Sequence, residues 1–189
     1  MSRWKPNARE RLERAALDLF AEQGFAQTTV PQIAERAGLT TRTFFRHFAD
    51  KREVLFAGEE HIPERVARIT DFGATPLTPM AFVEDGLVEI AQTAFADQFA
   101  RLRAVRAVIA TDPGLKEREL RKFADLAELV TDALTRNGCP RADAELVAHL
   151  ATTVLRLSLT RWLDQEVPER SLPDLIRETT ARLRSLTRE

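Results

Sequence analysis

The most informative segment of this chain is VPQIAERAGLTTRTFFRHFADK, residues 30–51. Its pattern predicts two short helices joined by a tight turn at Gly38, the second of them polar and basic, and then the capped start of a third helix. Glycine suits the turn because it adopts a positive φ without a steric penalty. This arrangement is typical of a helix-turn-helix motif, which inserts its second helix into the major groove of DNA.

The composition is that of an ordinary globular protein. Of the 189 residues, 44% are hydrophobic and 30% are charged, which suffices for one large domain or two small ones. No apolar run reaches the ~18–20 residues of a membrane span, and the N-terminus lacks the apolar core of a signal peptide. Cys139 is the only cysteine, which excludes an internal disulfide and a cysteine-based metal site. We therefore expect a cytoplasmic protein with no membrane partner.

Charge is distributed unevenly along the chain. Residues 1–52 contain 10 Lys and Arg against 6 Asp and Glu, a net charge of +4, whereas residues 53–189 contain 18 against 23, a net charge of −5. A basic segment on an acidic body fits a DNA-binding domain at residues 1–52, followed by a domain at residues 53–189 that does not bind DNA. A difference of this size also arises by chance, so it only supports the interpretation of the motif.

Apolar residues recur at spacings of three and four along the whole chain, and alternating strand patterns are missing, which predicts an all-α fold of about nine helices. A three-helix N-terminal domain would precede a larger helical body. The predicted helices span about residues 7–23, 29–38, 41–48, 50–63, 141–165 and 171–186, and two more open at Pro79 and Pro113. Helix caps are expected at Thr29, Thr40 and Asp50, and glycine ends at Gly24 and Gly138.

The second helix of the motif carries the side chains suited to reading DNA. Its buried face would use Phe44 and Phe48, together with Ile33 and Leu39 from the first helix and the turn. The outward positions are then Thr41, Arg42, Thr43, Arg46 and His47. Arginine pairs with a guanine edge and a threonine methyl meets a thymine methyl, whereas groups at the far end of the helix are better placed for phosphates.

Alternatives stay open for several of these residues. Arg46 could be a solvated surface arginine, and His47 could interact only with the helix end. The basic arm Arg3-Trp4-Lys5 could enter the minor groove or remain disordered.

Paired residues at fixed spacing link this segment to a known family. The pairs and single residues are Thr28-Thr29, Ile33-Ala34, Ala37-Gly38, Phe44-Phe45, His47-Phe48, Lys51 and Val54-Leu55. Together they resemble the N-terminal domain of the TetR family of transcriptional regulators. The motif covers about a quarter of the chain, and the rest agrees with the family in length and helical character alone.

The resemblance implies a homodimer whose heads bind a palindromic DNA operator and whose larger helical body serves effector binding and dimerisation. It places Thr41, Arg42, Thr43 and Arg46 at base-facing positions, and Thr29, Phe45, His47 and Lys51 at phosphate-facing positions. The sequence departs from the family at three places. Phe45 stands where the family often has tyrosine, so no hydroxyl reaches a phosphate; Arg42 replaces a common glycine; and Pro31 replaces a polar residue. These departures leave the operator sequence open.

An effector pocket is expected among the helices of residues 79–137. The candidate lining residues are Phe82, Phe95, Phe99, Val105, Ile109, Phe123 and Leu126. Such a pocket would take an apolar or amphipathic small molecule, although most of these residues also fit a plain core. The arginines of segment 101–106 could neutralise an acidic ligand or form a solvated face, and Cys139 could sense oxidants if its thiol were activated.

The last two predicted helices are the expected dimer interface, as an antiparallel pair that docks on its copy in a four-helix bundle. The candidate interface residues are Leu150, Val154, Leu157, Trp162, Leu172, Leu175, Ile176 and Leu183. The alternative is that these stripes pack on the body of their own chain.

No enzyme motif is present: the sequence lacks a nucleophile elbow, a phosphate loop, a zinc-binding helix and a dinucleotide fingerprint. No catalytic residue, metal ligand or cofactor is therefore expected. The predicted function is that of a sequence-specific DNA-binding transcriptional regulator, a repressor released from its operator by a small molecule. A regulator without a small effector, constitutive or controlled by a protein partner, and a transcriptional activator are the alternatives.

Overall fold

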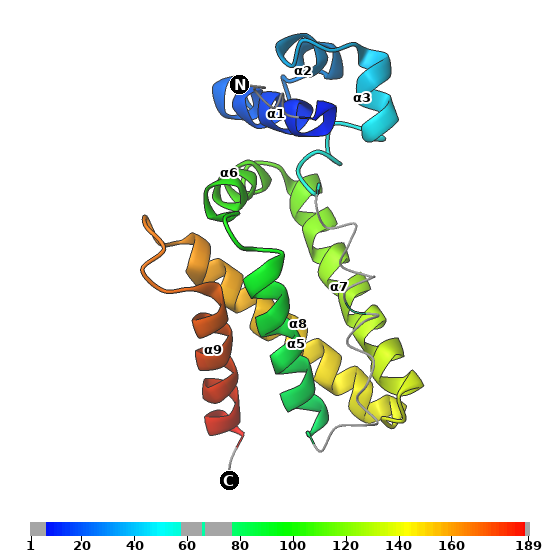
Figure 1. Ribbon diagram of the computed structural model, residues 1–189, viewed down its shortest axis with the longest axis vertical. Helices are drawn as coiled ribbons and strands as arrows, with labels where there is room; N and C mark the ends of the chain where they lie inside the picture. Colours follow the sequence, from blue (N-terminus) through cyan, green and yellow to red (C-terminus); the bar gives the residue numbers. More distant parts are fainter. Residues whose placement is uncertain (1–6, 58–65, 67–76, 188–189) are drawn as a thin grey trace, which may run out of the picture. The chain divides into compact units, whose positions relative to one another are not determined.

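The computed structural model describes residues 7–57, 66 and 77–187. Every regular element in these residues is an α-helix, so the predicted all-α fold is confirmed (Figure 1). The chain divides into two compact units, one formed by residues 1–60 with 104–117 and the other by residues 61–103 with 118–189. Segment 104–117 packs with the N-terminal helices, so this division does not coincide with the predicted domains. The functional boundary between residues 52 and 53 stays a prediction.

Three short helices begin the first unit: α1 (Ala8–Gln23), α2 (Val30–Arg36) and α3 (Thr41–His47). Each starts at a side chain that caps a free backbone N–H group, since Asn7, Thr29 and Thr40 accept hydrogen bonds from the third residue after them. Thr29 and Gln32 complete the predicted capping box. Gly24 ends α1 with φ +84°, a positive value that glycine adopts without strain.

The core of the first unit is built around α1, which buries the face predicted from its spacing. Its buried residues are Leu12, Ala15, Ala16, Leu19 and Phe20. They pack with Ile33 of α2, Phe44 of α3 and Leu55 in one hydrophobic cluster. The cluster also takes side chains from the end of α6 (Phe99–Ile109) and the first turn of α7 (Pro113–Arg136). The helix-turn-helix domain therefore completes its core with residues that follow it by about fifty positions in the sequence.

The fourth predicted helix is described only at its start. Asp50 accepts hydrogen bonds from the backbone N–H groups of Arg52 at 2.7 Å and Glu53 at 3.1 Å, as expected of a cap. Residues 51–57 then form consecutive turns in place of a regular α-helix. The later part of this predicted helix, including Pro63, lies outside the described residues, as does the arm Arg3-Trp4-Lys5.

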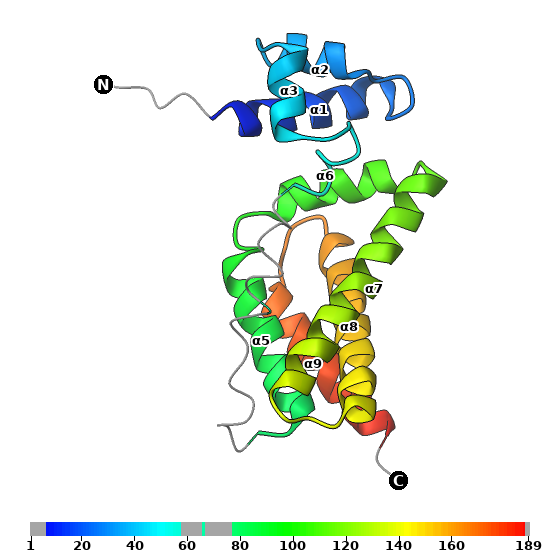
Figure 2. The same cartoon turned by 90° about the vertical axis from the view of Figure 1, so that its right-hand side faces the viewer.

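The second unit is a helical bundle of α5 (Pro79–Thr93), α8 (Arg141–Leu163), α9 (Leu172–Leu186) and most of α7. Figure 2 shows α5, α8 and α9 packed side by side. Small residues on α8, among them Ala144, Ala148 and Ala151, are almost fully buried and permit this close approach. The buried Ser158 hydroxyl lies 3.2 Å from the carbonyl oxygen of Leu175, to which it donates a hydrogen bond that joins α8 to α9.

Helix α6 was not predicted as a separate element. The chain breaks after α5 at residues 94–98, where Asp97 has φ +57°, and resumes as α6 at Phe99. Neither proline nor glycine occurs at this break, so the usual sequence signals of a helix end are missing there.

Candidate nucleic-acid interface

Helix α3 presents its polar face to the surrounding solvent. Arg42 and Arg46 are exposed and lie one helical turn apart, while Thr41, Thr43 and His47 are half-buried. On the opposite face Phe44 is fully buried in the core of the first unit. The five side chains predicted to face outward are thus accessible, and their contact with DNA stays a prediction.

The turn between α2 and α3 is held by Arg11, a residue that no sequence pattern indicated. The guanidinium of Arg11 on α1 donates hydrogen bonds to the carbonyl oxygens of Ala37 and Gly38, the second at 3.3 Å. These carbonyls lie at the end of α2, where the backbone has no partner within the helix. Gly38 has φ +62°, and a Cβ atom there would lie 3.0 Å from the guanidinium. The predicted glycine requirement therefore has two causes, the backbone conformation and the closeness of Arg11.

Lys51 lies on the loop between α1 and α2 and uses all three of its donors there. Its Nζ atom donates hydrogen bonds to the carbonyl oxygens of Phe25 at 2.7 Å, Thr28 at 2.8 Å and Ala26 at 3.3 Å. The same atom lies 4.4 Å from the centre of the Phe25 ring. Burial lowers the pKa of Lys51 below its ordinary value, and Asp112 opposes this shift.

The structure thus gives Lys51 a clamping role for the loop that leads into α2. The family resemblance implies a phosphate contact for Lys51, and that contact stays a prediction. No local pattern could have announced the clamp, because Lys51 and Phe25 are 26 residues apart.

We expect Lys51→Met to lower the free energy of unfolding by about 1–3 kcal/mol, because three carbonyl groups lose their donor. Urea unfolding of the full chain would measure the loss. Lys116→Met, the same change at an exposed lysine of the first unit, serves as the control. A Lys51→Met protein of unchanged stability, whose DNA binding depends less steeply on salt by about one phosphate contact, would contradict the clamp.

Two ion pairs shape the charge around the motif. Glu22 accepts two hydrogen bonds from Arg36 at 2.8 and 2.7 Å, and these bonds lower the pKa of Glu22 below its ordinary value. Burial of Asp50 would raise its pKa, but hydrogen bonds from the Arg52 side chain and from the backbone N–H groups of Glu53 and Arg52 bring the pKa below its ordinary value. The arginines of both pairs donate hydrogen bonds to carboxylates. Among the described residues, Arg42 and Arg46 donate none to a carboxylate.

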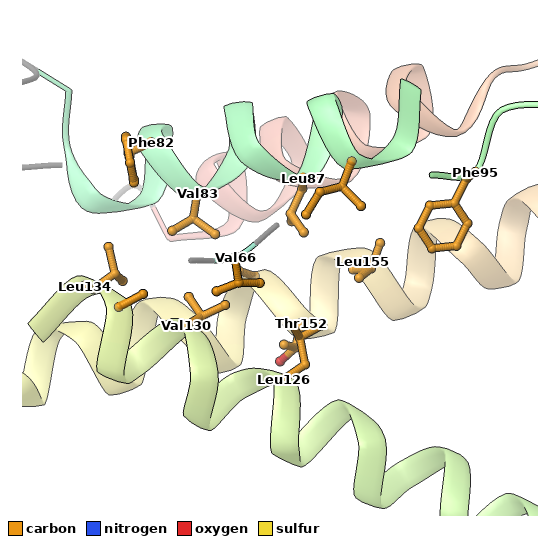
Figure 3. A pocket seen from close by; sticks show the side chains of 13 residues that line it. Val66, Phe82, Val83, Leu87, Phe95, Leu126, Val130, Leu134, Thr152 and Leu155 are labelled. Atoms are coloured by element: carbon orange, nitrogen blue, oxygen red, sulfur yellow. The ribbon is translucent and has the colours of Figure 1, made fainter. Parts of the chain in front are cut away.

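The second unit contains an apolar cavity of about 50 Å³. Figure 3 shows side chains from α5, α7 and α8 pointing toward one another around it. Its described lining residues are Val66, Phe82, Val83, Leu87, Ile90, Phe95, Leu126, Val130, Ala133, Leu134, Ala151, Thr152 and Leu155. None of these carries a charge, and the Thr152 hydroxyl already donates within α8, to the carbonyl oxygen of Ala148 at 3.0 Å.

The cavity departs from the predicted pocket at four of seven residues. Phe82, Phe95 and Leu126 line the cavity, and their contact with an effector stays a prediction. Phe99 instead packs edge-on against Trp162, with ring centres 5.1 Å apart, and Phe123 packs on the core of the second unit outside the lining. Val105 and Ile109 belong to the core of the first unit. The helical spacing of these four residues marked a buried face and could not indicate which core would bury it.

The predicted dimer interface needs a similar correction. Five of its eight residues, Val154, Trp162, Leu172, Leu175 and Ile176, are buried in the core of their own chain. Leu150 and Leu183 are half-buried, and Leu157 is exposed. On α8, Leu146 and Leu157 are exposed and Leu150 is half-buried without packing on the core cluster, and spacings of four and seven place the three on one face.

Other candidates from the sequence have structural roles. Arg103 of segment 101–106 donates to the carbonyl oxygen of Glu166 at 2.9 Å. Cys139 is buried, and burial raises the pKa of its thiol, which opposes the activation that an oxidant sensor needs. Among the residues that the structure describes, no cluster of side chains could hold a metal ion and no helix is long and apolar enough to cross a membrane.

Comparisons with known proteins agree with this geometry. A family model for bacterial regulatory proteins of the tetR family matches residues 13–57. The HTH-type transcriptional regulator TcmR of Streptomyces glaucescens is 36% identical over 129 residues, which cover 62% of this chain and 54% of TcmR. The chain spans between 54% and 64% of the length of the first three curated relatives that it matches.

Solved structures share the fold. A TetR-family transcriptional regulator from Syntrophomonas wolfei superposes with a TM-score of 0.66 and 19% identity, covering 95% of this chain and 94% of that one. The repressor FadR of Thermus thermophilus, solved in complex with lauroyl-CoA, superposes with a TM-score of 0.56 and 22% identity, covering 96% of this chain and 95% of that one. At these identities the likeness concerns the fold.

Proposed function

Because this chain belongs to the TetR family of bacterial transcriptional regulators, we infer that it binds an operator in duplex DNA and controls transcription from it. The observation that carries the proposal is the exposed face of α3, where Arg42 and Arg46 are accessible on a helix anchored by the fully buried Phe44. A rigid helix with an accessible basic face suits insertion into the major groove.

The proposal is tested by Arg42→Ala and Arg46→Ala. Each change should weaken operator binding by about 1–3 kcal/mol and relax the sequence preference at one base pair, because a paired arginine discriminates a guanine edge. Fluorescence anisotropy on a selected operator and on a random duplex would measure both effects. Arg182→Ala, at an exposed arginine of α9, is the control. Equal losses on the operator and on the random duplex would contradict the assignment of these arginines to bases.

We further propose that the cavity of the second unit takes an apolar or amphipathic effector. Its described lining offers hydrocarbon surface and no charge, so burial of apolar area would supply the binding free energy. The volume of about 50 Å³ holds only a few water molecules, so a larger effector must widen the cavity. FadR of Thermus thermophilus, which shares the fold, was solved with lauroyl-CoA, a ligand with an apolar chain.

Helix α7 offers a route from the cavity to the head. Its first turn enters the core of the first unit through the fully buried Leu115, and its later turns line the cavity through Leu126, Val130 and Leu134. An effector that shifts α7 would therefore act on a helix that begins in the DNA-binding head. The proposed outcome is release from the operator, for which a difference of a few kcal/mol between two conformations suffices.

Val130→Phe should abolish the response to effectors while operator binding persists, because the larger ring fills the cavity. The measurement is the shift in melting temperature with a panel of apolar compounds that includes triclosan. A compound at a hundred times its dissociation constant stabilises the unmodified protein by about 2.7 kcal/mol. Val167→Phe, the same change at an exposed site, is the control and should keep the shift. A Val130→Phe protein that responds like the unmodified protein would place the effector elsewhere.

We also propose a homodimer, since two recognition helices must stand ~34–36 Å apart to read successive major grooves of one operator. The accessible apolar face of α8, formed by Leu146, Leu150 and Leu157, supports this proposal. Helix α9 would flank it in a four-helix arrangement with the second copy.

A further inference from the structure

Phe45 is the only exposed aromatic side chain among residues 7–57, 66 and 77–187, with 57% of its surface accessible. Its neighbour Phe44 is fully buried, so the two adjacent rings lie on opposite faces of α3. A single exposed apolar side chain needs no explanation by itself. The position of Phe45 is what gives it meaning, because Thr41 and Arg42 lie one turn before it on the same face and Arg46 follows directly.

The Phe45 ring also contacts an anchored neighbour on its own helix. It stacks edge-to-face on Phe44, with ring centres 5.5 Å apart and an angle of 84° between the planes. Phe44 in turn packs against Phe48, at 5.5 Å between ring centres, inside the core. An ordered apolar side chain makes a contact at little further entropic cost. The contact with Phe44 therefore favours Phe45 as a side chain that can bind a partner at little cost in conformational entropy.

The chemistry of the major groove limits what this ring can recognise. A phenylalanine ring has no donor for a phosphate oxygen, so Phe45 cannot make a hydrogen bond at the phosphate-facing position that the family resemblance implied. A donor or acceptor on a base edge that is covered by the Phe45 ring would lose its hydrogen bond to water and gain none from the ring. The one apolar group that bases present in the major groove is the C5-methyl group of thymine, and phenylalanine is among the side chains that contact it.

We propose that Phe45 reads a thymine methyl group of the operator and so determines specificity at that base pair. The inference rests on the proposed DNA-binding function, and it changes the expected role of Phe45 from a phosphate neighbour to a base reader. Arg42 and Arg46 would then read guanine edges on either side of an apolar contact to thymine.

The test removes the methyl group alone. The full chain first selects its operator from a library of random DNA duplexes. Each thymine of the selected duplex is then replaced in turn by deoxyuridine, which keeps the base pair and loses only the methyl. We expect the unmodified protein to bind about fourfold more weakly at one thymine in each half-site, the effect of one methyl group taken from apolar contact.

Phe45→Ala should bind the thymine and deoxyuridine duplexes equally. Phe45→Gln, which keeps the length of the side chain and loses its apolar surface, should do the same and serves as the second variant. Arg46→Ala is the matched control: it should bind every duplex more weakly and still distinguish thymine from deoxyuridine. Circular dichroism should report the same melting temperature for both Phe45 variants as for the unmodified protein, because the side chain lies outside the core.

Two results would overturn the inference. One is an unmodified protein that binds all deoxyuridine duplexes as tightly as the thymine duplex. The other is a preference for thymine that survives in both Phe45 variants. Failure of the proposed function looks different, because a protein that selects no sequence and binds no duplex gives no operator to substitute.

Discussion

Phe44→Ala should lower the free energy of unfolding of the first compact unit by about 3–5 kcal/mol, the range for removing a fully buried aromatic ring. Phe44 has no accessible surface, and its ring contacts the rings of Phe45 and Phe48 with centres 5.5 Å apart. Alanine in its place would leave a cavity between α3 and α1 that these short helices could close only by moving α3. Since domains are stable by about 5–15 kcal/mol in total, this loss leaves the unit marginally folded.

Phe45→Ala is the matched control, because it makes the same chemical change at the adjacent residue of the same helix. Its side chain is mostly exposed, so the expected change in the free energy of unfolding is within about 0.5 kcal/mol. Urea unfolding followed by far-ultraviolet circular dichroism would compare the two variants. Equal losses would show that α3 is not anchored through Phe44, and the argument for a rigid recognition helix would fail with it.

The features of the fold that the sequence predicted are local ones. The cap at Thr40 accepts its hydrogen bond from Thr43, three residues away, and the glycine at Gly38 meets a backbone requirement of its own residue. Thr78 and Ser171 cap α5 and α9 in the same way. Such signals are readable because all the atoms concerned lie within one turn of chain.

The contacts that hold the candidate site together are of another kind. Arg11 and Lys51 each donate hydrogen bonds to carbonyl groups 23 to 27 residues away, and neither sequence position indicates such a contact. Backbone carbonyls occur at every residue, so a basic side chain carries no local sign of which ones it will meet. The sequence therefore indicated the exposed polar face of α3 and missed the carbonyl contacts of Arg11 and Lys51.

The periodicity of apolar residues does not predict which surface buries them, as the second unit shows. A stripe of apolar residues indicates a buried face but not the partner that buries it. Val105 and Ile109 were expected at an effector pocket and lie in the core of the first unit. Trp162 and Ile176 were expected at a dimer interface and lie in the core of their own chain. What remains accessible after the chain has buried its own stripes is the better guide to a partner surface.

On α8 that remainder is the face of Leu146 and Leu157, which are 61% and 44% exposed, with the half-buried Leu150 between them. We expect Leu157→Glu to yield a monomer, because a carboxylate placed in an apolar contact must lose its water without gaining a partner. Sedimentation of the full chain should then report half the mass of the unmodified protein. Leu120→Glu, at a leucine of α7 that is 59% exposed, is the matched control and should leave the mass unchanged.

The loss of the dimer should have the largest effect on operator binding of all these changes. A dimer binds its second half-site as an intramolecular event, which raises affinity by roughly 10²–10⁴-fold without any new contact to DNA. Leu157→Glu should therefore weaken operator binding by that factor, while the affinity of each head for a single half-site stays the same, because α3 is untouched. Anisotropy titrations on one-site and two-site duplexes separate the two quantities. A Leu157→Glu protein that sediments as a dimer and keeps its operator affinity would move the partner surface away from this face of α8.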